Sequence, residues 1–141
     1  MNSQTPMWVY LIPLAMVAVG FLIASQRTGS VASAAVGHRR LELTTTASPA
    51  EAFARIALIA GKYKIDDRDA SRGILVLSSG ISFGSWGFLY PVFITANGTG
   101  SQIDIGIHSK LIQFGPIVGL AHRKLRDAIE AAVSAPAARV A

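Results

Sequence analysis

The sequence predicts an α+β protein in which an N-terminal transmembrane helix precedes a two-layer domain, with two helices packed on one face of an antiparallel sheet. Three observations predict this class: an uncharged apolar stretch opens the chain, several short segments alternate apolar with polar residues, and two later segments have helical spacing. The expected order of elements in the domain is β-α-β-β-β-β-α. A chain of 141 residues has room for one such domain.

The apolar stretch covers residues 7–24, MWVYLIPLAMVAVGFLIA, and all 21 charged side chains lie at or after Arg27. As a helix it would be about 27 Å long, which is close to the hydrocarbon thickness of a bilayer. Trp8 and Tyr10 lie at one end and Arg27 follows the other, and these residue types favour the membrane interfaces. We therefore expect an anchor in the inner (plasma) membrane.

A cleaved signal peptide is the alternative interpretation of this segment. The residues before the apolar stretch, MNSQTP, contain no Lys or Arg, and the best small-residue cleavage site, at residues 32–34, lies well beyond the apolar stretch. Both observations favour an anchor. The basic residues Arg27, Arg39 and Arg40 follow the span, so the positive-inside rule favours a cytoplasmic domain, with an outward-facing domain as the alternative.

Composition divides the chain into four parts. Residues 1–26 form the anchor, 27–39 a flexible linker, 40–134 the α+β domain and 135–141 a disordered tail. The linker segment TGSVASAAVGH, at 28–38, is made of small residues without formal charge when His is neutral, which is typical of a flexible spacer.

The first half of the domain contains a strand, a helix and two further strands. Residues 40–46 alternate as a half-buried strand does, and Ser48, Pro49 and Glu51 together mark a helix start. This helix should reach about Ala60, with Gly61 as its stop. Residues 62–66 and 74–79 then read as antiparallel strands joined by a polar turn.

The second half predicts a hairpin and a terminal helix. Strands over 88–95 and 101–108 flank Asn97-Gly98, a favoured type I′ turn, which would place Val92 opposite Ile103 and Tyr90 opposite Ile105. Pro91 lacks an N–H and therefore predicts an edge or a bulge in its strand. The helix should run from about Pro116 to Val133. Its expected apolar stripe comprises Val118, Ala121 or His122, Leu125, Ile129 and Ala132, and its expected i,i+4 ion pairs are Arg123–Asp127 and Arg126–Glu130.

No motif predicts catalysis, a metal or a cofactor. The chain has no cysteine, and its histidines, at positions 38, 108 and 122, lack the spacing of metal ligands. A cation loop at Asp66, Asp67 and Asp69 is disfavoured because their order does not fit a calcium loop. The glycines at 80, 84 and 87 precede a strand rather than a helix, which disfavours a phosphate loop.

The net charge of +5 comes from scattered basic residues, so it favours an anionic membrane or an acidic partner rather than nucleic acid. Residues 81–94 and 111–121 are more apolar than a small core requires. Their excess predicts either loops packed on the core or an exposed patch that binds a membrane-associated protein. The candidate anchors of this patch are Phe83, Trp86, Phe93 and Phe114.

The anchor, the S-P-A-E-A-F helix start, the G-K-Y-K-I strand, the S-W-G step and the I-H-S hairpin end together resemble small bacterial membrane-anchored domains of uncharacterised function. The resemblance covers residues 40–133. Such domains, with a sheet and a C-terminal helix, are similar in outline to helix-grip folds. This likeness implies a groove between sheet and helix, and no functional residue is carried over.

The sequence therefore favours a non-enzymatic accessory module, tethered to the membrane and binding another membrane-associated protein. The alternative is a binder of lipid or a small apolar ligand, with its cleft between the C-terminal helix and the Tyr90/Ile105 face of the sheet. An enzyme is the third and least favoured possibility. The sequence indicates neither partner identity nor oligomeric state.

Overall fold

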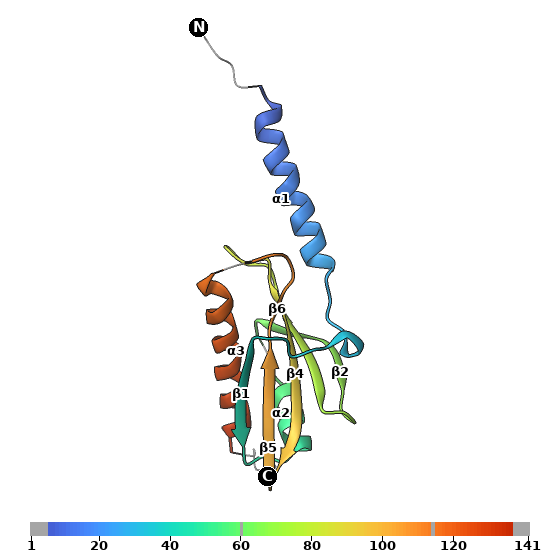
Figure 1. Cartoon of the computed structure of the whole chain (residues 1–141), viewed down its shortest axis with the longest axis vertical. Helices are drawn as coiled ribbons and strands as arrows, with labels where there is room; N and C mark the ends of the chain where they lie inside the picture. Colours follow the sequence, from blue (N-terminus) through green and yellow to red (C-terminus); the bar gives the residue numbers. More distant parts are fainter. Residues whose placement is uncertain (1–5, 60, 114, 137–141) are drawn as a thin grey trace.

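A long N-terminal helix projects from a small two-layer domain (Figure 1). The computed structural model describes residues 6–59, 61–113 and 115–136. The elements in chain order are α1 (Trp8–Gln26), the 3-10 helix η1 (Val31–Ser33), β1 (Arg40–Thr45), α2 (Pro49–Ala57), β2 (Tyr63–Asp69), β3 (Ile74–Ser79), β4 (Phe88–Asn97), β5 (Gly100–Gly106), β6 (His108–Ser109) and α3 (Pro116–Ser134).

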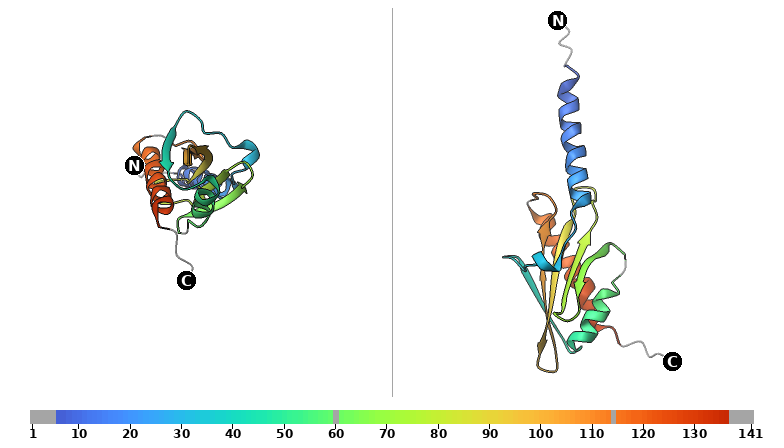
Figure 2. Two further views of the ribbon diagram at one scale, coloured as in Figure 1. Left: turned by 90° about the horizontal axis from the view of Figure 1, so that it is seen from below. Right: turned by 90° about the vertical axis from the view of Figure 1, so that its right-hand side faces the viewer.

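The strands form one antiparallel sheet in the order β1-β5-β4-β3-β2, and the short β6 pairs with β4. Helices α2 and α3 cover the same face of this sheet, which we call the inner face (Figure 2). The α+β class, the antiparallel sheet and the placement of both helices are therefore confirmed. Among the described elements, the two-residue β6 and the short η1, within the predicted linker, were not expected.

A single core joins the inner face to both helices. Its residues alternate along each strand, as a sheet covered on that face requires. The largest fully buried side chains are Leu75, Leu77, Tyr90, Val92, Ile103 and Ile105 on the strands and Ile56, Leu125 and Ile129 on the helices.

Helix α2 begins as predicted, because the Ser48 hydroxyl accepts the N–H of Glu51 at 3.3 Å. It ends at Ala57, before the predicted Ala60, which lies outside the described residues. Leu58, the C-cap residue, is 81% exposed, whereas Ile59 packs against the core from outside the helix. Gly61 has a positive φ, but it lies beyond the C-cap residue Leu58, so its prediction as the helix stop is wrong.

Helix α3 confirms most of its predicted stripe. His122 is buried rather than Ala121, and Val133 rather than Ala132. The Arg126–Glu130 ion pair forms at 3.5 Å, whereas the ion pairs of the described residues do not include Arg123–Asp127.

The hairpin has the predicted faces but a different register. Its loop is Gly98-Thr99, so Val92 pairs with Ile105 and Ile94 with Ile103. The predicted pairs, Val92 with Ile103 and Tyr90 with Ile105, are therefore wrong by two residues. Within this loop only Gly98 has a positive φ, which fits a type II′ turn with glycine at the first loop position, not the type I′ turn expected for Asn97-Gly98. A shift of two keeps every side chain on its predicted face.

Pro91 lies in the central strand β4, neither at an edge nor in a bulge. It pairs with Val76 of β3 on one side. On the other side the ladder to β5 stops at Val92 and resumes at Leu89, which pairs with β6. The missing N–H of proline is thus accommodated by a gap in the ladder, and this gap separates β5 from β6.

Strand β2 is longer than predicted and contains a bulge at Asp66. The carboxylates of Asp66 and Asp67 accept the backbone N–H groups of Gly29 and Val31 at 2.7 and 2.8 Å. The segment predicted as a flexible spacer therefore lies against the outer face of the sheet. In Figure 1 it runs from the β2 side across this face to β1.

The crossing segment also fits closely over β5 and β6. The ring of His108 donates from Nε2 to the carbonyl of Ala35 at 2.8 Å. At Gly106, a Cβ atom would lie 2.8 Å from the Val36 carbonyl oxygen and 2.9 Å from Pro91 Cγ. There is no room for a side chain at this position.

Gly106→Ala should therefore destabilise the full chain by about 1–3 kcal/mol, because the new methyl group meets backbone that cannot move aside easily. Gly119→Ala is the matched control: no atom lies within 4 Å of its added Cβ, and alanine favours a helix interior by about 1 kcal/mol. Thermal unfolding of the full chain in detergent, followed by circular dichroism, measures both. Equal melting temperatures for Gly106→Ala and wild type would contradict close packing of the crossing segment on Gly106.

Candidate functional site

A groove of about 570 Å³ lies between the sheet and the N-terminal half of α3. This volume is within the range of small-molecule sites. The lining residues are Lys62, Tyr63, Ser79, Gly80, Ile81, Ser82, Phe83, Ser85, Phe88, Tyr90, Ile117, Leu120, Ala121 and Lys124. The sequence predicted a cleft between α3 and the Tyr90/Ile105 face. Tyr90 does line the groove, whereas Ile105 is fully buried in the core.

Aromatic side chains from the sheet meet at the groove. Tyr90 contacts Tyr63 edge-to-face, with ring centroids 5.7 Å apart, and Phe88 at 6.1 Å. Burial raises the pKa of Tyr90 to about 12, against a smaller opposing effect of its hydrogen bond with Ser79. Burial also raises the pKa of Tyr63. Both phenols therefore stay neutral at physiological pH, which suits an apolar ligand.

The opposite wall comes from one side of α3. Ile117 and Ala121 are half-buried, and Leu120 is 48% exposed. Lys62 and Lys124 supply the charges of the groove, and its described lining contains no carboxylate. The groove can therefore hold an apolar body, with cations available to an acidic end.

The groove opens at the end of the domain that carries α1. The loop after β3 contributes Phe83, which is fully exposed, and Ile112, in the loop before α3, is 83% exposed. Figures 1 and 2 both place these loops, the start of α3 and the end of α1 at the same end of the domain.

Helix α1 contacts these loops directly. A Cβ at Gly20 would lie 3.3 Å from the Trp86 ring and 3.6 Å from Leu111, so both side chains pack on the helix surface. Just past the helix end, the Arg27 guanidinium donates to the Lys110 carbonyl at 2.7 Å. These contacts and the Asp66 and Asp67 hydrogen bonds fix the domain against the end of α1.

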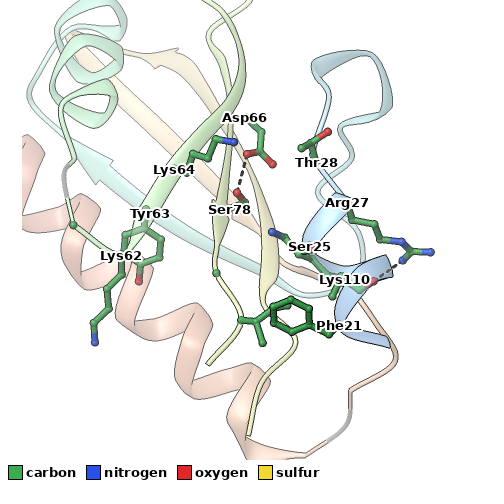
Figure 3. Close-up of a pocket in the computed structure, with 14 residues that line it drawn as sticks. Phe21, Ser25, Arg27, Thr28, Lys62, Tyr63, Lys64, Asp66, Ser78 and Lys110 are labelled. Atoms are coloured by element: carbon green, nitrogen blue, oxygen red, sulfur yellow. Dashed lines mark hydrogen bonds between the residues drawn. The ribbon is translucent and has the colours of Figure 1, made fainter. Parts of the chain in front are cut away.

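A second hollow, which we call the notch, has a volume of about 450 Å³ (Figure 3). It lies where the end of α1 meets the start of β2, the end of β3 and the residue that follows β6. It is lined by Phe21, Ala24, Ser25, Arg27, Thr28, Gly61, Lys62, Tyr63, Lys64, Asp66, Ser78, Gly80, Ile81 and Lys110. Four of these residues are basic and one is acidic. Sequence reasoning missed the notch, because its residues come from four separate segments.

The three candidate partner-binding residues that the structure describes do not form one patch. Phe83 is exposed at the groove mouth, and Trp86 is half-buried against α1. Phe93 points to the outer face in the middle of the sheet, between Ile74 and Asp104. Phe114 lies outside the described residues. Of the predicted interface residues, Trp8 and Tyr10 are exposed on the first turn of α1, and Arg27 follows its last residue.

The three aspartates considered as a cation loop have structural partners. Asp66 and Asp67 hold the crossing segment, and Asp69 accepts from Ser71 and Arg72 in the β2–β3 turn. The hydrogen bond from Val31 is the main cause that lowers the pKa of the Asp67 carboxyl. No group of three potential metal ligands occurs in the part of the chain that the structure describes.

His122 is the one buried histidine of the described residues. Its Nε2 lies 2.7 Å from the Ile105 carbonyl oxygen, which can only accept, so Nε2 carries the proton. Burial is the main cause that lowers its pKa below 6.5; the positive charge of Arg39 adds to this effect, and the hydrogen bond opposes it. His122 therefore ties α3 to β5, and no carboxylate among the described residues pairs with it.

Comparisons with known proteins show the fold. No protein-family model matches the chain, and no curated protein matches its sequence. The crystal structure of Ara h 8.0201 aligns with a TM-score of 0.53 at 14% identity, over 67% of this chain and 93% of that one. TTHA0849 from Thermus thermophilus aligns with a TM-score of 0.41 at 13% identity, over 67% of this chain and 94% of that one. The domain therefore shares its fold with Ara h 8.0201, and at this identity the likeness shows the fold alone.

The buried His122 predicts a loss of stability in mild acid. Its pKa is lower in the folded than in the unfolded chain, so stability is complete above a pH of about 6.5 and falls as the pH drops below it. The melting temperature of the wild type should therefore decrease as the pH is lowered from neutral into mild acid. His122→Gln keeps a donor for the carbonyl and should flatten this decrease, whereas His38→Gln should not. An equal decrease in all three proteins would assign the effect to other groups.

Proposed function

We propose that this protein is a membrane-tethered binder of lipid or another small apolar ligand, and that the groove between the sheet and α3 is its site. The observation that carries the proposal is the groove itself: mainly apolar, lined by neutral aromatic residues and by one side of α3. The groove occupies the place that the helix-grip outline of the sequence implies.

Support for the tether comes from α1. It is the one helix in the described part of the chain that is long and apolar enough to cross a membrane, and only 6% of its apolar window is buried. Exposed apolar side chains along a whole helix need surroundings other than water. A bilayer supplies them, with Trp8 at one interface and Arg27 at the other. The positive-inside rule places the domain in the cytoplasm in this proposal.

The groove favours a ligand binder over the accessory module that the sequence favoured first. A protein-binding patch would need its aromatic residues on one continuous surface. Phe83 and Phe93 instead lie in different parts of the domain, and α1 covers part of Trp86.

Retention of the helix is testable in cells. We expect the mature chain to keep residues 1–26 and to stay in the membrane pellet after alkaline extraction, because about 27 Å of apolar helix holds it there. Intact-mass spectrometry of the pelleted protein shows whether the chain is retained in the membrane and whether residues 1–26 are still attached. Protease digestion of right-side-out vesicles should leave the domain intact if it is cytoplasmic. A mature chain that begins near Ala35 would contradict the tether.

Ligand occupancy of the groove is testable by photo-crosslinking. Full-length protein in nanodiscs receives a mixture of neutral and anionic glycerophospholipids with a photoactivatable group on one acyl chain. We expect crosslinks in peptides around Phe88, Tyr90 and Ile117, which line the groove. Ala121→Trp should fill the groove and abolish most of these crosslinks.

Ala131→Trp is the matched control, because Ala131 lies on the same helix but is exposed and outside the groove. It should keep the groove crosslinks. Crosslinks confined to residues 8–26 in the wild type would show contact with the bilayer only and would refute the proposed function.

A further inference from the structure

The notch beside α1 has more positive charge than its own residues neutralise. Arg27, Lys62, Lys64 and Lys110 line it, with Asp66 as its single carboxylate. Both Asp66 oxygens already accept hydrogen bonds, at 2.7 and 2.8 Å, from the Gly29 N–H and the Ser78 hydroxyl. None of the ion pairs formed by the described residues includes any of the four cations.

Packing and backbone hydrogen bonds fix the position of Lys110 beside the notch. Only 7% of the residue is exposed. Its backbone is fixed on both sides, since its N–H donates to Gly87 at 3.1 Å and its carbonyl accepts from Arg27 at 2.7 Å. Among the described residues, the Lys110 ammonium has no hydrogen-bond or ion-pair partner. No buried side-chain nitrogen of the described residues lacks a hydrogen-bond partner, so the Lys110 ammonium reaches the open space of the notch, where it can pair with an anionic ligand.

The notch and the groove are neighbours. Lys62, Tyr63, Gly80 and Ile81 line both hollows. The cationic hollow and the apolar hollow therefore meet around the start of β2 and the end of β3. A ligand with an anionic head and an apolar chain can occupy both at once, whereas a purely apolar ligand would leave the cations unpaired.

The notch also lies at the depth expected of lipid headgroups. Phe21, Ala24 and Ser25, on the last turns of α1, form one of its walls (Figure 3). If α1 spans the bilayer, these turns lie where hydrocarbon gives way to headgroups. The phosphates of the adjoining leaflet are then at the same level as the four cations.

We infer that the ligand is an anionic glycerophospholipid, with its phosphate in the notch among Lys110, Lys64, Lys62 and Arg27, and an acyl chain in the groove. This inference rests on the proposed function and names the ligand class for the same site. The phosphate replaces the counterions that the fold lacks, and Tyr63 and Ile81 contact the lipid where head and chain join. A zwitterionic lipid can enter the groove, but its headgroup ammonium offsets its own phosphate and leaves the notch with excess positive charge.

The test compares headgroups in the same nanodiscs. Photoactivatable phosphatidylglycerol and phosphatidylcholine are tested separately, at equal mole fraction and fixed salt. We expect the anionic probe to label the groove peptides about fivefold more, which is the effect of about one Lys or Arg close to an anionic headgroup. Lys110→Gln should remove most of this preference. Because Lys110 is buried, Lys62→Gln/Lys64→Gln is the second variant, which changes only exposed side chains, and it should have the same effect.

Arg72→Gln/Arg123→Gln is the control, because it removes two positive charges from positions outside both hollows. It should keep the preference. Equal loss in the control would assign the preference to general membrane electrostatics and overturn the inference. Equal labelling by the two probes would also overturn it while leaving the proposed function intact, whereas absence of groove labelling by either probe would refute the proposed function itself.

A final arm separates a lipid headgroup from free phosphate. Inorganic phosphate is added against sodium chloride of the same ionic strength. If the notch holds a headgroup, the two salts should reduce anionic labelling equally. Loss of the preference in phosphate alone would show that the notch takes free phosphate, which would overturn the assignment to a lipid.

Discussion

Burial of β3 on both faces is the constraint on which the arrangement of this protein depends. Its inner residues Leu75 and Leu77 pack under the helices, and its outer residues Ile74 and Val76 are also buried. A strand of this kind needs a cover on its outer side. Residues 28–36 provide it: at Gly29 the backbone lies so close to Val76 that a Cβ would be 2.2 Å from Val76 Cγ1. The segment with the composition of a flexible spacer is therefore part of the fold.

Attachment of this cover to the sheet also sets the position of the groove relative to α1. The crossing segment is attached to β2 through Asp66 and Asp67, and α1 leads directly into it. Arg27 and Trp86 add contacts at the junction. The domain is therefore held close against the helix instead of moving freely on an 11-residue spacer. In a membrane, the groove mouth and the notch would both face the headgroup layer.

The structure shows how the basic residues behind the net charge of +5 are distributed. Part of the basic character is paired locally, as in the Arg126–Glu130 and Arg55–Glu51 pairs on the helices. The four cations of the notch are different, because neighbouring carboxylates do not neutralise them. These cations are scattered in the sequence and gathered in space, and they make a charged hollow beside an apolar one on a single continuous surface.

Local signals in the sequence determined most of the elements. These signals depend only on residues that are close in the sequence, so they can be recognised without the fold. They are the Ser48 cap, the alternation along β1 and the absence of charge in the first 26 residues. The hydrophobic pattern also assigned the residues of the hairpin strands to their faces, and the two-residue shift in register preserved that assignment. The unbroken apolar run Ile74–Leu77 could have revealed that both faces of β3 are covered.

Tertiary structure alone decided the hairpin register, the burial of His122, the docking of residues 28–36 and both hollows. The register depended on which backbone angles Gly98 adopts, since the type I′ and type II′ turns compete at the same sequence. The notch needs Arg27, Lys64 and Lys110, which are far apart in the chain. They meet only because the end of α1, the start of β2 and the residue after β6 lie at the same corner. Sequence patterns record what lies three or four residues away, whereas a binding surface is made of contacts between distant segments, and only packing brings those together.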